Sequence, residues 1–264
     1  MIKQYIPKVI KALEEASALI MEVYTRDFNI EIKADKSPVT EADKASNDLL
    51  IKHLSEFNLP IISEEKENPD YQDRKDAPLI WSVDPLDGTR EFIRKNDQFC
   101  ICVALIENGK PILGFIACPV EKTIMFGSKS IGAIEIPFGA NDIYDKKWGI
   151  NKSKSKSTKV LAHSNSPFSE TSLKFVADLE KQFGSIDLIR KGSALKFIDL
   201  VKGNADFYIR LGPTMEWDIA AGQVIYDAVG GEVINYHTKE ELTYNKENLK
   251  NPHFLAKLKT TKLD

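Results

Sequence analysis

The two aspartates of the stretch Asp84-Pro85-Leu86-Asp87-Gly88-Thr89 are the residues of this chain best placed for chemistry. The apolar run at 79–83 directly before them predicts a buried strand, and the proline has no amide donor with which to continue a ladder. The glycine permits a left-handed turn directly after the second carboxylate. The pattern predicts two carboxylates held close together at a strand end, although Asp, Pro and Gly are also common in ordinary turns.

Three further acids stand next to predicted strand or helix ends, and each has a simple structural interpretation. Asp43 lies three residues after Thr40, which is the spacing of a capping box at a helix start. Glu64 follows the apolar pair Ile61-Ile62 and has the position of a solvated acid after a strand. Asp218 lies where it would complement a helix dipole. Taken singly, none of these acids requires a functional role.

A cluster of Glu64, Asp84, Asp87 and Asp218 would require cations. Two carboxylates about 4 Å apart repel by about 4 kcal/mol at an effective dielectric of about 20. Oxygen donors without Cys or His select hard ions such as Mg²⁺ or Mn²⁺ over zinc. If the fold brings these acids together, they are expected to bind a hard divalent cation.

Helices packed against an antiparallel sheet are predicted for the first half of the chain. Apolar residues at three- and four-residue steps predict an amphipathic helix over 3–24, and a second helix follows Thr40 to about residue 57. The charged segment 30–37 is expected to be extended and to end at Pro38. Apolar runs predict strands, two of them joined by an Asn-Gly hairpin turn, at 59–63, 79–83, 99–106, 111–117, 123–126 and 132–136. Residues 90–95 predict one helical turn whose first amides form an anion-binding concavity.

An alternation of strands and helices is predicted for the second half, which favours an α/β subdomain. The six elements, beginning with a strand, lie at 159–163, 171–183, 186–190, 192–203, 206–210 and 217–229. The Lys- and Ser-rich run 152–159 predicts a flexible connector and a subdomain boundary. We therefore expect one catalytic unit in which an α+β subdomain, 1–150, carries most of the acids and an α/β subdomain, 151–264, carries Asp218 and substrate contacts.

Ser193 and Lys196 lie at the predicted start of the helix over 192–203. In the simpler interpretation, Ser193 is a helix N-cap and Lys196 is exposed. In the functional interpretation, the hydroxyl and the ammonium face a phosphate at the same helix start.

The composition indicates a globular protein large enough to bury a sizeable core, with 264 residues of which 42% are hydrophobic. The net charge of -3 argues against a general nucleic-acid surface, so an anionic substrate must be held locally. No run reaches the roughly 18 apolar residues of a membrane span, and the charged N-terminus is not a signal peptide. Three cysteines without C-x-x-C spacing predict buried reduced thiols and a cytoplasmic location. Loose attachment to an anionic inner leaflet, and a monomer or a homodimer, remain open.

Four segments resemble, in order and spacing, the motifs of the inositol monophosphatase superfamily of magnesium-dependent, lithium-sensitive phosphatases. They are Pro38-Val-Thr-Glu-Ala-Asp43, Ser63-Glu-Glu65, Val83-Asp-Pro-Leu-Asp-Gly-Thr89 and Trp217-Asp-Ile-Ala-Ala-Gly222. Within the superfamily, the chain is similar to the bacterial 3'(2'),5'-bisphosphate nucleotidases in segments 36–40, 86–93, 109–114, 192–197 and 210–214. The resemblance implies a layered sugar-phosphatase fold of alternating helix and sheet layers. One departure is Ala162-His163-Ser164-Asn165-Ser166, where that family has a Ser-x-Ser-His stretch, and it puts nucleoside recognition in question.

The resemblance implies a function in sulfur metabolism: removal of the 3'-phosphate from adenosine 3',5'-bisphosphate, which gives AMP and phosphate. It implies two or three Mg²⁺ ions, with Mn²⁺ as a substitute, and an in-line attack of water on phosphorus. Glu64, Asp84 and the Leu86 carbonyl would hold one metal, and Asp84, Asp87 and Asp218 another. Thr89 and Asp43 would orient and deprotonate the water. The implied substrate contacts are the amides of Gly88 and Thr89 together with Ser193, Lys196, Arg210 and Asp218.

Two other functions stay open at this point. The first is an inositol monophosphatase or a broad sugar-phosphate phosphatase, since the shared motifs describe phosphoryl chemistry and leave the alcohol undefined. The second is a non-catalytic protein that binds Mg²⁺ and a nucleotide. The presence of both Thr89 and Asp43 argues against it, because a pure binder needs no pair that activates water.

Overall fold

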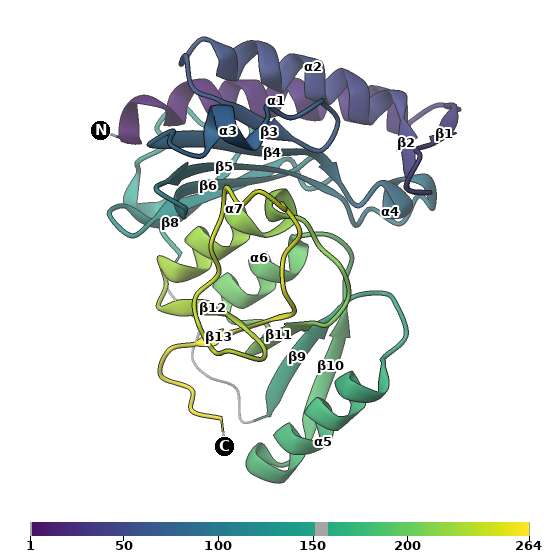
Figure 1. The fold of residues 1–264 in the computed structure, drawn as a ribbon, viewed down its shortest axis with the longest axis vertical. Helices are drawn as coiled ribbons and strands as arrows, with labels where there is room; N and C mark the ends of the chain where they lie inside the picture. The colour runs from purple at the N-terminus through teal and green to yellow at the C-terminus, as the bar shows by residue number, and fades with distance from the viewer. Residues whose placement is uncertain (1, 151–157, 264) are drawn as a thin grey trace.

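Two amphipathic helices, α1 (Ile6–Tyr24) and α2 (Glu41–Ser55), cover one face of the first sheet in the computed structural model, which describes residues 2–150 and 158–263 (Figure 1). The apolar side of α1 is buried along its length, as its three- and four-residue spacing predicts. A 3₁₀ turn, η1 (Ile2–Gln4), precedes α1. The first predicted helix therefore begins later than expected, because Pro7 suits only the first turn of an α-helix.

Six strands form this first sheet within residues 2–150, in the order β3-β4-β5-β6-β7-β8. Their bounds are Ile61–Ser63, Leu79–Asp87, Cys100–Glu107, Lys110–Cys118, Thr123–Ser128 and Gly132–Pro137. Neighbouring strands are antiparallel as predicted, except that β3 runs parallel to β4. The connection 64–78, which contains the short helix α3 (Tyr71–Arg74), returns the chain to the end of the sheet at which β3 began. The exception matters because parallel strands bring Glu64 and Asp84 to one edge.

Both faces of the sheet are buried, and β5 shows how. Ile101, Val103 and Leu105 point to the core beneath α1 and α2. The alternate residues, which include Cys102 and Ala104, point to a second core on the opposite face. An uninterrupted apolar run is therefore required here, because a strand presents successive side chains to opposite faces. The three cysteines, Cys100, Cys102 and Cys118, are buried and free, which confirms that prediction.

Two hairpins differ in how well they could be predicted. The turn between β5 and β6 has Asn108 at φ 47° and Gly109 at φ 76°, as a type I′ turn requires. By contrast, residues 30–40 form a hairpin of β1 (Ile30–Ile32) and β2 (Pro38–Thr40), so the prediction of one extended segment that ends at Pro38 was wrong. Pro38 is tolerated because it is the first residue of an edge strand, where no donor is needed.

Residues 158–263 contribute five strands in the order β10-β9-β11-β13-β12. Their bounds, from β9 to β13, are Lys159–His163, Ile186–Arg190, Phe207–Arg210, Gly231–Asn235 and Phe254–Leu258. The first three are parallel, as the predicted α/β alternation requires, and α5 (Glu170–Phe183) lies outside this sheet (Figure 1). β12 and β13 were not predicted, because single short apolar runs give a weak periodic signal.

Two helices, α6 (Leu195–Lys202) and α7 (Glu216–Asp227), lie between the two sheets (Figure 1). Helices and sheets therefore alternate in layers, as predicted. The connector 152–159 lies outside the described residues up to residue 157, and the subdomain boundary near residue 150 stays a prediction. A 3₁₀ turn, η2 (Lys146–Trp148), comes just before it. Among the described residues, no helix is long and apolar enough to cross a membrane.

Close packing of α7 against β6 depends on Gly114. A Cβ atom at this position would lie 2.5 Å from the Ala221 carbonyl oxygen and 2.5 Å from Val224 Cγ1. Because the nearest atoms include backbone, α7 could not accommodate a side chain there without moving. The glycine therefore sets the distance between the sheet and the helix that carries Asp218.

We expect Gly114→Ala to lower the free energy of unfolding by about 1–3 kcal/mol, because it overpacks the interface between β6 and α7. Urea denaturation measures the loss. Gly212→Ala is a suitable control, since its Cβ would meet only the flexible Arg210 guanidinium at 3.4 Å or more. Equal stability of the two variants would show that α7 is not fixed by this contact.

Candidate functional site

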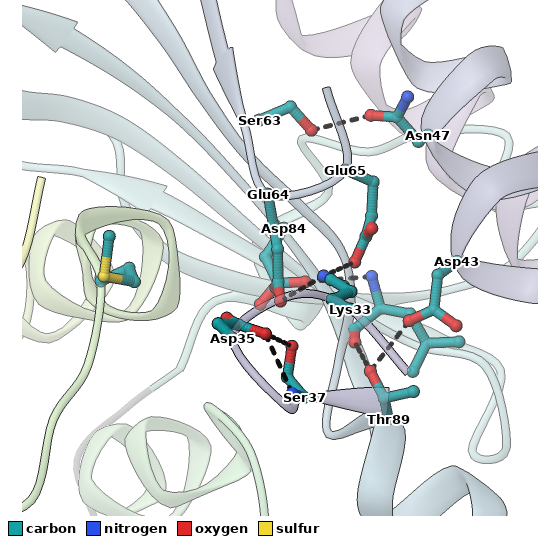
Figure 2. Close-up of polar contacts among 12 residues, drawn as sticks. Lys33, Asp35, Ser37, Asp43, Asn47, Ser63, Glu64, Glu65, Asp84 and Thr89 are labelled. Atoms are coloured by element: carbon teal, nitrogen blue, oxygen red, sulfur yellow. Dashed lines mark hydrogen bonds and ion pairs between the residues drawn. The ribbon is translucent and has the colours of Figure 1, made fainter. Parts of the chain in front are cut away.

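Three acids from different elements meet at one edge of the first sheet. Glu64 follows β3, Asp84 lies in β4 and Asp218 lies in the first turn of α7. One carboxylate oxygen from each lies within 4.8 Å of the others. Figure 2 shows Glu64 and Asp84 side by side. The structure therefore brings together three of the four acids that sequence analysis placed in a cluster, across the two halves of the chain.

Burial makes this carboxylate cluster unfavourable when every member is ionised. Asp84 is 1% exposed, and its burial, followed by repulsion from Glu64 and Asp87, raises its pKa well above the ordinary value. Burial and the same two charges also raise the pKa of Asp218 well above its usual range. Since the donors are all oxygen atoms, the cluster fits a hard divalent cation better than zinc.

Asp87 faces different neighbours from the other three acids. Its Oδ2 accepts a hydrogen bond from the Ala194 amide and lies 3.9 Å from Cys100 Sγ. Burial raises the pKa of Asp87 to about 6, although the nearby Lys196 charge opposes the rise. The register of β4 shifts between Asp84 and Asp87, which pair with Cys102 and Cys100 of β5, so the irregularity brings both carboxylates to one face of the sheet. Asp87 is nevertheless not one of the three acids whose carboxylate oxygens lie within 4.8 Å of one another. The role of Asp87 as a metal ligand therefore stays a prediction, as does that of the Leu86 carbonyl, which lies 3.3 Å from Thr89 Oγ1.

Asp43 makes both of the interactions that its sequence context left as alternatives. Its Oδ2 accepts from the Thr40 amide at 2.7 Å and from the Thr40 hydroxyl at 2.6 Å, which caps α2. Its Oδ1 accepts from the Thr89 hydroxyl at 2.8 Å (Figure 2). Burial raises the pKa of Asp43 in spite of these hydrogen bonds. Because the two oxygens serve different partners, helix capping does not exclude a role in chemistry.

Lys33 is a site residue that sequence analysis missed. The β1–β2 hairpin places its ammonium 3.1 Å from Glu64 Oε1 and in contact with Glu65 (Figure 2). Burial disfavours the ammonium, but the charges of Glu64 and Glu65 outweigh it and raise the pKa of Lys33. In the sequence, Lys33 is only one lysine of the charged segment 30–37, so nothing there marks it as a site residue. The hairpin shows that its ammonium compensates the charge of Glu64.

A pocket of about 370 Å³ opens beside the acids, which is large enough for a nucleotide-sized ligand. It lies between α4 (Thr89–Ile93) with the residues around it and the starts of α6 and α7. Six of the residues predicted to bind metal or substrate line it: Asp87, Gly88, Ser193, Lys196, Arg210 and Asp218. Gly88 has φ 99° directly before α4, as its predicted turn requires.

Two cations that line this pocket, Lys196 and Arg210, are held by backbone carbonyls. Lys196 is 3% exposed, so its interpretation as an exposed residue was wrong. Its ammonium donates to the carbonyls of Lys191 and Ser193, and burial lowers its pKa to about 8. Arg210 donates to the Pro213 carbonyl at 3.2 Å. The helix N-cap is Ala194, so the prediction that Ser193 fills that position was also wrong.

The side chains of residues 162–166, where the sequence departs from the Ser-x-Ser-His stretch, have different surroundings. His163 is 4% exposed and its ring stacks on Phe168 with a centroid distance of 4.2 Å, at the end of β9. Ser164 and Asn165 line the pocket instead. The pocket wall here presents an amide and a hydroxyl rather than an imidazole.

Comparison with known proteins agrees with this architecture. A model of the inositol monophosphatase family matches residues 2–262. The 3'(2'),5'-bisphosphate nucleotidase CysQ of Escherichia coli K12 is 32% identical over 256 residues, which cover 94% of this chain and 97% of that protein. The protein of the same name from Haemophilus influenzae is 31% identical over 240 residues, which cover 89% of this chain and 86% of that protein.

A solved structure gives the same result for the fold. The crystal structure of CysQ from Bacteroides thetaiotaomicron matches with a TM-score of 0.86 and 34% identity, over 96% of this chain and 97% of that one. The layered fold and the resemblance stated from the motifs are both confirmed. Because the family model spans almost the whole chain and full-length relatives exceed 30% identity, the chain belongs to the inositol monophosphatase family.

Proposed function

We propose that this chain is a magnesium-dependent phosphomonoesterase that hydrolyses the 3'-phosphate of adenosine 3',5'-bisphosphate to give AMP and inorganic phosphate. The observation that carries the proposal is the carboxylate cluster of Glu64, Asp84 and Asp218 beside a nucleotide-sized pocket. The names of the relatives, 3'(2'),5'-bisphosphate nucleotidase, support the choice of substrate.

The donor set supports Mg²⁺ as the cofactor. Glu64, Asp84, the Leu86 carbonyl, Asp87 and Asp218 would hold two or three ions, and Mn²⁺ would be a substitute because it has the same preference for oxygen. When bound, Mg²⁺ lowers the pKa of the attacking water and neutralises charge on the phosphate oxygens. Burial and mutual repulsion raise the pKa values of Asp84 and Asp218, so a bound cation would favour the ionised carboxylates that ligate it.

Asp43 and Thr89 are suited to orient and deprotonate the attacking water. The Thr89 hydroxyl gives its proton to Asp43 Oδ1 in a hydrogen bond of 2.8 Å, so its oxygen is free to accept one from water. As the water oxygen attacks phosphorus and the bond to the 3'-oxygen breaks, the water would give a proton to Thr89 while Thr89 gives its own to the Asp43 carboxylate. The leaving 3'-oxygen would take a proton from solvent water to become the 3'-hydroxyl of AMP. The amides of Gly88 and Thr89 would hold the phosphate.

Lys196, Ser193 and Arg210 would contact the substrate from the opposite side. All three line the pocket, and Lys196 lies close enough to Asp87 for the two charges to interact. A buried cation near the acids opposes the repulsion between those acids and a phosphate. These three residues therefore favour the binding of an anionic substrate against a cluster of carboxylates.

Phosphate release from three substrates tests the proposal. Adenosine 3',5'-bisphosphate, inositol 1-phosphate and fructose 1,6-bisphosphate are compared, each with Mg²⁺ and with EDTA. We expect metal-dependent release with a preference of about tenfold or more for the nucleotide. A tenfold ratio corresponds to a difference of about 1.4 kcal/mol in free energy. Preference for inositol 1-phosphate would favour an inositol monophosphatase, and preference for fructose 1,6-bisphosphate a broad sugar-phosphate phosphatase. Release from none of the three would favour a non-catalytic binding protein.

Thermal unfolding tests the metal site without an activity assay. We expect Mg²⁺ at a hundred times its dissociation constant to stabilise the protein by roughly 2.7 kcal/mol, and Asp84→Asn to remove most of this effect. Without metal, the variant should be at least as stable as the wild type, because one buried repelling charge is gone.

Asp227→Asn is the matched control. Asp227 is a half-buried acid whose pKa is also raised, to about 6, but it does not line the pocket, so this variant should keep the Mg²⁺ effect. An unchanged Mg²⁺ effect in Asp84→Asn would contradict the metal assignment.

The two roles of Asp43 separate in one variant. For Asp43→Ala we expect a loss of about 1 kcal/mol in stability from the missing cap, and a fall of roughly 10² to 10⁴ in kcat from the missing base. Glu41→Ala is the control, because Glu41 is in the same helical turn but pairs with Arg26 on the surface. If kcat falls no further in Asp43→Ala than in Glu41→Ala, Asp43 acts only as a cap.

A further inference from the structure

Two buried thiols lie next to Asp87, one of the residues that line the pocket. Cys100 and Cys102 are two residues apart on β5, so both side chains leave the same face of the sheet. β4 pairs Asp87 with Cys100, which brings the carboxylate to that face as well. One carboxylate oxygen and the two sulfurs all lie within 4.8 Å of one another. This thiol–carboxylate group shares no residue with the carboxylate cluster.

The separations within the thiol–carboxylate group match those of a tetrahedral metal site. The two sulfurs are 3.9 Å apart, and Cys100 Sγ is 3.9 Å from Asp87 Oδ2. In a tetrahedral Zn²⁺ site, two sulfurs at about 2.3 Å from the metal are about 3.8 Å apart, and a sulfur and an oxygen are about 3.5 Å apart. The two sulfurs therefore need almost no movement to share one ion, and the carboxylate needs only a small approach.

The surroundings of this group also suit a set of metal ligands. The Ala194 amide donates to Asp87 Oδ2, which orients the carboxylate as outer partners orient metal ligands. Ser193 Oγ lies 3.5 Å from Cys100 Sγ and lines the pocket, so the group reaches the pocket on that side. The Lys196 ammonium interacts with the charges of Asp87 and Cys100. It would offset the negative charge that two thiolates and a carboxylate keep after they bind one divalent ion.

Donor type distinguishes this group from the carboxylate cluster. The cluster offers only oxygen atoms, which favour Mg²⁺ and Mn²⁺. Thiolates favour softer ions, of which Zn²⁺ accepts sulfur and carboxylate oxygen in the same four-coordinate site. The Ser193 hydroxyl or a water molecule would supply the fourth donor. One region of the protein therefore presents two donor sets with different metal preferences.

We propose that Asp87, Cys100 and Cys102 form a second metal site, which prefers Zn²⁺ and similarly soft ions, and that its occupation inhibits the phosphatase. The inhibition rests on the proposed function, whereas the binding does not. Both sites would need Asp87, so an ion on the thiols withdraws this carboxylate from Mg²⁺. The two thiol protons leave to solvent as the ion binds, because the thiolate is the ligand.

Titration with Co²⁺ tests the binding without any turnover. Co²⁺ gives a charge-transfer absorption in the near ultraviolet when thiolates bind it. The titration is done in excess Mg²⁺, which occupies the oxygen donors, and Zn²⁺ is then added. We expect the thiolate band in the wild type and its loss with Zn²⁺. In Cys100→Ala and in Cys102→Ala, the affinity for Co²⁺ should fall by at least roughly tenfold, because even residues that only support a ligand contribute about 10- to 100-fold.

Cys118→Ala is the matched control for these two variants. Cys118 is a buried thiol of the same core and is 3% exposed, but it does not belong to the thiol–carboxylate group. This variant should give the cobalt spectrum of the wild type. Thermal unfolding without metal shows which variants fold, and either of the two single variants is sufficient for the comparison. Absence of the band in the wild type, or an equal loss in Cys118→Ala, would overturn the site.

Inhibition by Zn²⁺ tests the consequence for activity. Phosphate release with saturating Mg²⁺ is measured against Zn²⁺ in the wild type and the three variants, each relative to its own rate without Zn²⁺. We expect the half-inhibiting Zn²⁺ concentration to rise by at least roughly tenfold in Cys100→Ala and in Cys102→Ala, and to stay unchanged in Cys118→Ala. The same concentration in all four proteins would overturn the inhibitory role. A thiolate band in a wild type that releases no phosphate from any substrate would support the metal site and contradict both the inhibition and the proposed function.

Discussion

Repulsion among desolvated carboxylates is the constraint on which the rest of the site depends. Asp84 is buried and shares its surroundings with Glu64 and Asp218, so positive charge must be supplied at this point. The protein supplies part of it from three directions. Lys33 approaches Glu64 from the β1–β2 hairpin, and Lys196 and Arg210 act on Asp87 and Asp218 from the other half of the chain. The remaining demand is what a divalent cation would meet.

Such a cluster persists only if rigid elements hold it. Asp84 lies on the buried strand β4 near its end, and Asp218 is on a helix that packs between two sheets. Gly114 lets that helix approach the sheet closely, and Gly222 lets α6 approach α7, since a Cβ there would meet the Phe197 ring. Close-packed interiors transmit small displacements, so the positions of the acids depend on contacts well away from them. The chemistry and the core are therefore coupled.

The site also shows how one side chain can cap a helix and still contact the residue proposed to orient water. Asp43 caps α2 with one oxygen and receives the Thr89 hydroxyl with the other. The cap fixes the orientation of the carboxylate. A fixed orientation suits a proton acceptor better than flexibility does. Capping and catalysis are alternatives when only the local sequence is considered. In the folded chain they are compatible, because α4 lies against the start of α2.

The sequence alone determined the helices, most strands and the turns, because apolar periodicity and residues such as Asn108-Gly109 act locally. Its acidic motifs also indicated the family and the metal chemistry. Tertiary structure decided the rest. The parallel pairing of β3 with β4, the β1–β2 hairpin that carries Lys33 and the burial of Lys196 depend on contacts between distant segments. So does the hydrogen bond that Asp87 accepts from the Ala194 amide, since no local pattern records which neighbour a side chain will face.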